Sequence, residues 1–398
     1  MLLTEEEQEA IINFQKYLRI STVHPNINYD ECITFLTQLG FEAGLTVHVF
    51  SPDLCKRLVV MTYEGTDPAL PSLLLNSHMD VVPVQEKHWK YDPFGAEIDK
   101  LGNIYARGAQ DMKGVGMQFV EAVRRCIKEG LKFRRTIHLS FVPEEEIGVK
   151  GMESFVKTDE FKKLNVGCVI DESMPGETDE FLLAYAERSS WHLEIICNGV
   201  TGHGSLLPDN TAGEKLRHII DKFMDFRKSE KKKLLNNSNL TLGDVTTVNL
   251  MIIKGGVQTN VLPSTMTALF VLGVPVDVDC DKLLNTIRKW CQDAGDGVIC
   301  KEVKINKYQE VTKLDKSNLW WMAFKNACDE MKLKIKPLVM PGGTDSRFLR
   351  KLGIPSFGFS AMNNTKNLLH NHDEYLNQQI FLNGIDIYYK IISELANV

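Results

Sequence analysis

Acidic residues and histidines follow short apolar runs at several points in this chain. Short runs of this kind, bounded by Gly, Pro or Asn, predict buried strands of a parallel sheet. Ligand and catalytic groups of such sheets gather at the carboxyl ends of the strands. Histidine and carboxylates meeting there would form an acidic cluster that a divalent metal ion neutralises. The runs and the residues after them are 72–77 with His78 and Asp80, 103–106 with Asp111, 136–143 with Glu144, Glu145 and Glu146, and 166–170 with Glu172.

The first two clusters allow specific roles. His78 and Asp80 lie two positions apart, on one side of an extended segment. Asp80 can therefore accept the far imidazole N–H of His78 and raise its basicity as a metal ligand. Asp111 stands just before a predicted helix, where it could cap the helix or bridge two metal ions with its two oxygens. We favour the bridge.

Three adjacent glutamates, Glu144, Glu145 and Glu146, repel one another unless a cation is present. Neighbours on an extended segment point to opposite sides, so one glutamate can bind a metal while the next takes a proton from metal-bound water. The residues alone do not decide which glutamate has which role.

Three segments further along the chain offer additional candidates. Either His370 or His372 could bind metal, or both could belong to a surface loop. His203, in a Gly-His-Gly turn, is an ordinary loop residue unless its domain faces an active site. The turn 341–347 opens a helix, and its backbone N–H groups suit an anion. The candidates in this turn are Gly343, Thr344 and Arg347, whose guanidinium could bind a carboxylate bidentately.

The elements that must position these residues predict an α/β fold. Strands and helices alternate up to about residue 182, which implies a mostly parallel sheet, and a helix is expected over 114–128. A strand, a helix, two strands and a helix then suggest a small inserted α+β domain. We therefore expect a catalytic domain in two parts, 1–187 and 307–398, around an inserted domain, 188–306.

Composition restricts the compartment and the partners. The 398 residues carry a formal net charge of -6, which argues against a nucleic-acid surface. No apolar window reaches membrane-spanning length, and no signal peptide is visible at the amino terminus. The nine cysteines include no Cys-x-x-Cys pair, so a disulfide framework and a thiolate metal site are not indicated. We expect a cytoplasmic protein with no membrane partner.

Taken together, these strings resemble the aminoacylase, carboxypeptidase G and succinyl-diaminopimelate desuccinylase family of co-catalytic zinc amidohydrolases. The resemblance runs from about residue 10 to the carboxyl end, and its motifs are jointly specific. The segments that carry it are 75–84, 104–113, 141–148, 186–189 and 369–374.

The resemblance implies two zinc ions per subunit. His78, Asp111 and Glu172 would hold one ion, and Asp111, Glu146 and His370 the other. Glu145 would be the general base, with Asp80 orienting His78. The inserted domain would be a dimerisation and lid domain, which forms a homodimer and closes over the site. His203 would stabilise the oxyanion in the partner subunit's site, and Asn260 would contact the substrate.

The resemblance also implies a small-molecule substrate, an N-acyl L-amino acid that is cleaved to a carboxylate and a free amino acid. A zinc dipeptidase or carboxypeptidase is the alternative enzyme, and an inactive dimeric binding protein on the same scaffold is a third reading. One departure bears on specificity. Family members commonly carry an arginine on the last strand of the inserted domain, whereas this chain has Gly273 or its neighbours there. If that arginine binds the substrate carboxylate in the family, this chain must use Arg347 instead or accept a different substrate.

Overall fold

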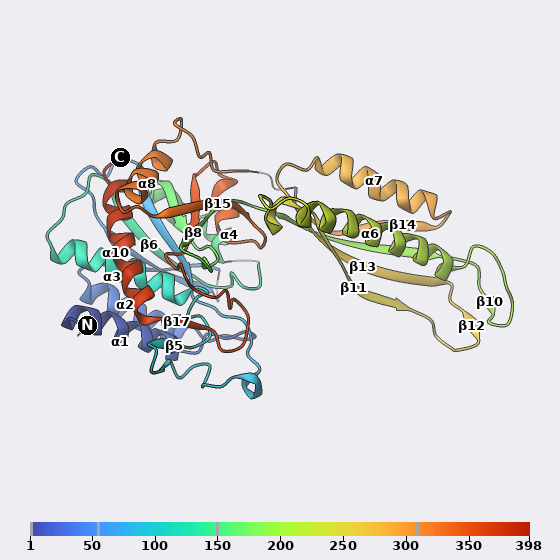
Figure 1. Ribbon diagram of the computed structural model, residues 1–398, viewed down its shortest axis with the longest axis horizontal. Coiled ribbons are helices and arrows are strands. Elements are labelled where there is room, and N and C mark those ends of the chain that lie inside the picture. The colour runs from blue at the N-terminus through green and yellow to red at the C-terminus, as the bar shows by residue number, and fades with distance from the viewer. Residues whose placement is uncertain (1–2, 54–55, 149–150, 308–309) are drawn as a thin grey trace. The chain divides into compact units, whose positions relative to one another are not determined.

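The computed structural model describes residues 3–53, 56–148, 151–307 and 310–398, which form two compact units (Figure 1). The first unit comprises residues up to 185 together with 312–337 and 344–398, and the second comprises 186–311 and 338–343. Residues 338–343 thus group with the second unit, and the domain boundaries expected from the sequence stay predictions.

An eight-stranded sheet forms the centre of the first unit, in the order β1-β2-β6-β3-β7-β16-β8-β15. The four inner strands β6, β3, β7 and β16 are parallel, while β1, β2 and β8 pair antiparallel at the flanks. This arrangement confirms the expected fold class. The strands are β1 (Thr46–Asp53), β2 (Lys56–Tyr63), β3 (Ser72–His78), β6 (Ile137–Val142), β7 (Val166–Asp171), β8 (Glu180–Glu187), β15 (Lys334–Met340) and β16 (Ser356–Phe359).

Helices pack on this sheet through apolar stripes. The expected helix over 114–128 is α3, in which Val115, Phe119 and Val123 are fully buried. Phe119 lies edge-on to Tyr388 of α10, with ring centroids 4.6 Å apart, and the two helices are neighbours in Figure 1. The helices are α1 (Glu5–Arg19), α2 (Asp30–Glu42), α3 (Lys113–Lys128), α4 (Gly151–Phe155), α5 (Asp159–Lys163), α8 (Leu319–Glu330), α9 (Ser346–Arg350) and α10 (Gln378–Leu395), with a 3₁₀ turn at Glu86–His88.

One expected strand of the large sheet belongs elsewhere. The run 103–106 forms β5 (Asn103–Tyr105), which pairs with β4 (Glu97–Ile98) and β17 (Tyr375–Asn377) in a separate small sheet. The expectation that this run delivers Asp111 to the edge of the large sheet is therefore wrong. Only three of its residues are extended, and they pair with the segment that follows Glu374.

The second unit has a four-stranded antiparallel sheet, β11-β13-β9-β14, with α6 and α7 against it. Phe223 of α6 stacks on Phe270 of β13 with ring centroids 3.9 Å apart. The sequence pattern missed β14, because most of its side chains are exposed. The elements are β9 (Ser189–Asn198), β10 (Gly202–His203), α6 (Ala212–Leu235), β11 (Thr247–Gly255), β12 (Val261–Leu262), β13 (Thr265–Val274), α7 (Cys280–Asp293) and β14 (Val298–Ile305), with a 3₁₀ turn at Leu242–Asp244.

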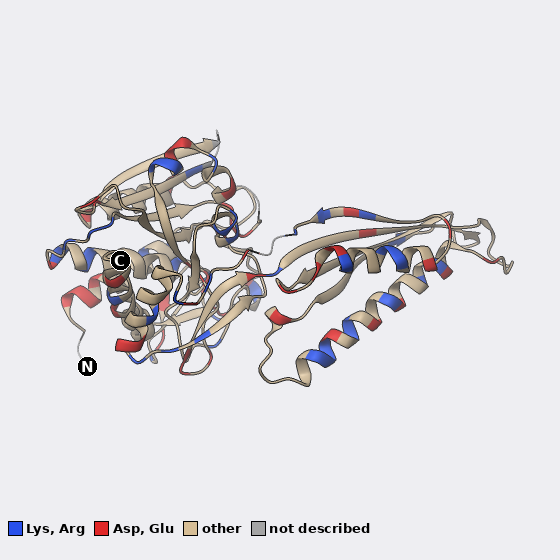
Figure 2. Cartoon of the chain, turned by 90° about the horizontal axis from the view of Figure 1, so that it is seen from above, with Lys and Arg blue, Asp and Glu red and all other residues tan. Residues whose placement is uncertain are grey.

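Acidic and basic residues are interspersed along both units (Figure 2). The basic stretch 227–233 lies within α6, which continues to Leu235. Within the described ranges, every helix is too short or too polar to cross a bilayer.

Candidate metal centre

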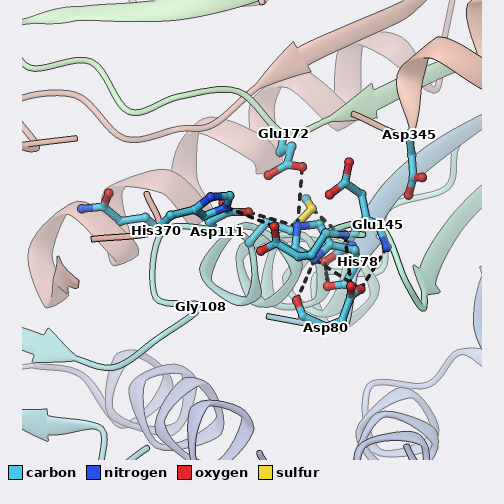
Figure 3. A network of polar contacts seen from close by, with 12 residues as sticks. His78, Asp80, Gly108, Asp111, Glu145, Glu172, Asp345 and His370 are labelled. Carbon is cyan, nitrogen blue, oxygen red and sulfur yellow. Dashed lines mark hydrogen bonds and ion pairs between the residues drawn. The ribbon is translucent and has the colours of Figure 1, made fainter. Parts of the chain in front are cut away.

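Two parallel strands bring the first expected ligands together. His78 ends β3, and Glu172 directly follows β7, the neighbouring strand. His78 Nε2 lies 3.5 Å from Glu172 Oε1 and 3.0 Å from Asp111 Oδ1. Figure 3 shows these side chains converging. Because His78 is only 1% exposed, little water surrounds its contacts with the carboxylates of Asp111 and Glu172.

The other expected ligands gather at the second oxygen of Asp111. His370 Nε2 lies 3.1 Å from Asp111 Oδ2 and 3.0 Å from Glu146 Oε2. Asp111 thus stands between the two histidines, as a bridging carboxylate would. The competing capping role has no support, since α3 begins after Met112 with no side-chain cap. His372, the alternative to His370, is exposed and stacks on His88.

Asp80 does not make the contact expected of it. The Nδ1 atom of His78 bonds the backbone carbonyl of Asp80 at 2.9 Å, whereas Asp80 Oδ1 is 3.8 Å away, too far for a hydrogen bond. The carboxylate instead accepts from the backbone N–H groups of Glu145 and Glu146, at 3.2 and 3.1 Å, and contacts His24. Asp80 therefore orients His78 through its main chain.

Glu374, to which the sequence pattern gave no role, holds the loop that carries Asp111. Its carboxylate accepts from Arg107 Nη1 at 2.7 Å and from the backbone N–H groups of Gly108, Gln110 and Asp111 at 3.1, 2.7 and 3.3 Å. Glu374 is 0% exposed and lies four positions after His370. One buried carboxylate thus ties the two ligand-bearing loops together.

A polar network lies beside Glu145. Asn76 donates to both Asp171 and Asp345 at 3.2 Å, and Ser346 donates to Asp171 at 2.7 Å. These buried side chains come from β3, β7 and the start of α9, and Figure 3 places Asp345 near Glu145. No sequence pattern marks this network, since each of its residues, taken alone, is of a type that is common in strands and turns.

The turn 341–347 divides between the units. Thr344 is buried, and the Nη2 atom of Arg347 lies 3.8 Å from where a Cβ would stand on Gly148. Arg347 is therefore beside the turn that follows Glu145, within reach of an anionic group near it. Gly343 belongs to the second unit, as do His203 and Asn260.

His203 and Asn260 lie together on a two-stranded ribbon of the second unit. β10 pairs with β12, and the N–H of Gly204 donates to the carbonyl of Asn260 at 2.8 Å. Both residues are exposed. Their assigned roles stay predictions.

Electrostatics show how costly the cluster is without a cation. Burial raises the pKa of Glu145 well above its usual range, and burial together with Asp111 does the same to the pKa of Glu172. Hydrogen bonds to Asp111 and Glu146 raise the pKa of His370 to about 10. Burial opposes a charge on His78, yet Glu172 and Asp111 raise its pKa as well. These shifts have one physical cause, the crowding of several carboxylates in a site with little solvent.

The donor set fits divalent metal ions. His78, Asp111 and Glu146 place donor atoms within 4.8 Å of one another, and so do His78, Glu145 and Glu172. Glu146 Oε1 is buried and has no hydrogen-bond partner among the described residues. A buried carboxylate oxygen without a donor needs a cation or a proton. Imidazole and carboxylate are ligands that zinc accepts.

A largely buried cluster of imidazole and carboxylate groups, at the carboxyl edge of a parallel sheet, is typical of a metal-dependent hydrolase. Residues 74–394 match peptidase family M20/M25/M40. The chain is 46% identical to aminoacylase-1 of Mus musculus over 99% of this chain and 97% of that one, and 42% identical to aminoacylase-1 of Dictyostelium discoideum over 99% of each. The chain belongs to peptidase family M20/M25/M40, and it is an amidohydrolase.

Solved structures share the fold at low sequence identity. A metallo-carboxypeptidase of the same family from Sulfolobus solfataricus has a TM-score of 0.72 at 18% identity, covering 99% of this chain and 100% of that one. A dinuclear metal-binding peptidase of the family from Bacillus subtilis has a TM-score of 0.69 at 16% identity, covering 99% and 98%.

Proposed function

We propose that this protein hydrolyses N-acyl L-amino acids to a carboxylate and a free L-amino acid, using two zinc ions per subunit. The observation that carries the proposal is the position of Glu145, a buried carboxylate beside the ligand cluster, with Arg347 at the following turn. The similarity to aminoacylase-1 of several organisms over nearly the whole chain supports this substrate class.

Glu145 carries the proton in the proposed reaction. Zinc, held by His78, Asp111, Glu146, Glu172 and His370, would supply Lewis-acid chemistry at the scissile carbonyl and at the attacking water. Glu145 takes a proton from the water that attacks the carbonyl carbon, and gives it to the amide nitrogen as the C–N bond breaks. A base that is largely buried suits this transfer, because few solvent molecules compete for the proton.

Arg347 binds the α-carboxylate of the substrate in this proposal. A guanidinium forms two parallel N–H···O bonds with a carboxylate. Thr344 and Gly343 precede it in the same turn, and Asn260 is assigned to the substrate by the family resemblance. Gly273 stands where family members carry arginine, and a side chain there would come within 2.8 Å of the Arg188 guanidinium. The small residue thus leaves room for Arg188.

The proposal includes a homodimer formed through the second unit. The edge strand β11 exposes Met251, Ile252 and Ile253, each at least 43% exposed. An apolar edge strand with unpaired backbone groups is a surface that a second copy can cover. Sedimentation at assay concentration tests this point, and a monomer would contradict it.

We also expect a cytoplasmic location, where the eight described cysteines would remain thiols.

A substrate screen of the zinc-loaded protein tests the reaction. N-Acetyl-methionine should be cleaved faster than any member of a dipeptide panel, and Glu145→Gln should lower kcat at least about a hundredfold while both metals stay bound. Faster cleavage of dipeptides would favour the alternative, a zinc dipeptidase or carboxypeptidase. No hydrolysis of either class would favour a binding protein. Near-normal turnover of Glu145→Gln with full metal content would remove Glu145 as the base.

A further inference from the structure

The contacts of Asp80 point to a role for His24, which lies 56 residues earlier in the chain. His24 Nε2 is 2.8 Å from Asp80 Oδ2 and donates to it, since a carboxylate only accepts. The same carboxylate binds the N–H groups of Glu145 and Glu146. Asp80 is fully buried, so these three donors replace water around it.

We propose that His24 is a positioning residue, which acts through Asp80 to fix the turn that carries Glu145 and Glu146. The inference rests on the proposed function, in which Glu145 is the base. It assigns to Asp80 a further task besides orienting His78, namely to hold the backbone of the turn.

The turn needs such support. Glu144 has φ of 63° and Gly148 has φ of 72°, with the N–H of Gly148 donating to the carbonyl of Glu145 at 2.6 Å. A glutamate in the left-handed region is unfavourable unless its surroundings hold it there. Two consecutive N–H groups bound to one carboxylate provide that hold, because hydrogen bonds to an ionised acceptor are the strong ones.

Main-chain pairing places His24 at Asp80. The N–H of Val81 donates to the carbonyl of Thr22 at 2.9 Å, and the N–H of His24 donates to the carbonyl of Val81 at 3.2 Å. Thr22 Oγ1 also donates to the carbonyl of Met79 at 2.6 Å. The segment that carries His24 therefore runs beside the segment that carries Asp80, and the side-chain contact follows from this register.

Losing His24 should loosen the turn without removing it. The carboxylate torsion of Asp80 is soft, and the His24 bond restrains the plane in which its oxygens lie. Without the His24 bond, the Asp80 carboxylate still accepts from the N–H groups of Glu145 and Glu146, but its orientation is less restricted. Because a displacement of about 1 Å can cost about a hundredfold in rate, we expect kcat to fall about ten- to a hundredfold. KM should change little, since Arg347 is untouched.

Three variants test the role in the zinc-loaded enzyme at one fixed pH. His24→Leu removes the donor, and His24→Gln offers a side-chain N–H in its place. His138→Leu is the matched control, because His138 is a buried histidine that bonds Thr62 and Leu164, outside the site. We expect the fall in kcat in His24→Leu alone, with full metal content and recovery in His24→Gln. An equal loss in His24→Leu and His24→Gln would overturn the proposal, as would an equal loss in His138→Leu.

Hydrogen exchange of the metal-free protein provides a readout that needs no activity. Amides of residues 143–148 should exchange faster in His24→Leu than in wild type, and should be restored in His24→Gln. His138→Leu should leave that peptide unchanged. Unaltered exchange of 143–148 in His24→Leu would overturn the inference even if N-acyl amino acids are substrates. Altered exchange with no hydrolysis would instead contradict the proposed function and leave the positioning role standing.

Discussion

Replacing Glu374 by Gln should destabilise the loop that delivers Asp111. In the structure, Glu374 Oε2 accepts from Arg107 and Gly108, while Oε1 accepts from Gln110 and Asp111. Glutamine keeps the shape of the side chain but turns one of these acceptors into an NH₂ donor. That NH₂ group would face two N–H donors, so the substitution removes two hydrogen bonds and sets donors against each other.

The expected cost follows from the burial of these groups. Two hydrogen bonds to a charged acceptor contribute about 1.5–3 kcal/mol each. The same loss can be estimated from the ion pair between Arg107 and Glu374, in which Arg107 is only 2% exposed. Breaking a buried ion pair by removing one partner costs about 3–5 kcal/mol. Both figures describe the same loss and are not added. We therefore expect the free energy of unfolding to fall by about 3–5 kcal/mol.

Urea unfolding of the metal-free protein measures this cost, and zinc titration of the folded variant should show weaker binding because Asp111 is less well held. Glu330→Gln is the matched control, since Glu330 pairs with Lys390 at the surface and is 61% exposed. A surface pair contributes about 0–1 kcal/mol. If Glu374→Gln costs no more than Glu330→Gln, the carboxylate does not hold the loop, and the reasoning fails.

Three further predictions concern single side chains. Glu146→Gln and His370→Ala should each lower zinc stoichiometry, measured by metal analysis, and two retained ions would remove that residue from the ligand set. His203→Asn should lower kcat about a hundredfold with zinc and fold intact; unchanged kcat would exclude an oxyanion role. Burial lowers the pKa of His138 from 6.5 to about 4. As the pH falls below 6.5, His138 binds a proton in the unfolded chain but not yet in the folded protein. The free energy of unfolding therefore falls by about 3 kcal/mol between pH 6.5 and pH 4. His138→Gln should remove this part of the pH dependence in urea unfolding, and an unchanged slope would contradict it.

The site residues that follow strands of the large sheet could be predicted from the local sequence pattern. An apolar run followed by a polar residue marks where a buried strand leaves the sheet, and parallel strands bring such points to one edge. His78 and Glu172 meet in this way at the ends of β3 and β7. The glutamates after β6 follow the same rule. No distant contact had to be known to place these residues together.

The positions of the site residues that lie on loops could not be predicted from the sequence pattern. Asp111 reaches the site from a loop that is held by hydrogen bonds to Glu374. The contact between Arg107 and Glu374 in this loop spans 267 residues of sequence. Hydrogen bonds of this range leave no periodicity in the sequence. His24 is likewise placed by pairing between two irregular segments. The family resemblance selected His370 over His372 as a ligand, but it assigned no role to Glu374 or to His24.

The side chains of the two neighbouring glutamates, Glu145 and Glu146, diverge from a turn whose backbone is held in place. Asp80 binds both N–H groups, so the peptide between Glu145 and Glu146 cannot turn over without breaking a buried hydrogen bond. With this peptide fixed, Glu146 lies 3.0 Å from His370, whereas Glu145 groups with His78 and Glu172. The sequence pattern placed Glu145 and Glu146 on an extended segment, which is wrong, because both lie in the turn over 145–148. Their side chains diverge from this turn, whose backbone is held by a third carboxylate, that of Asp80.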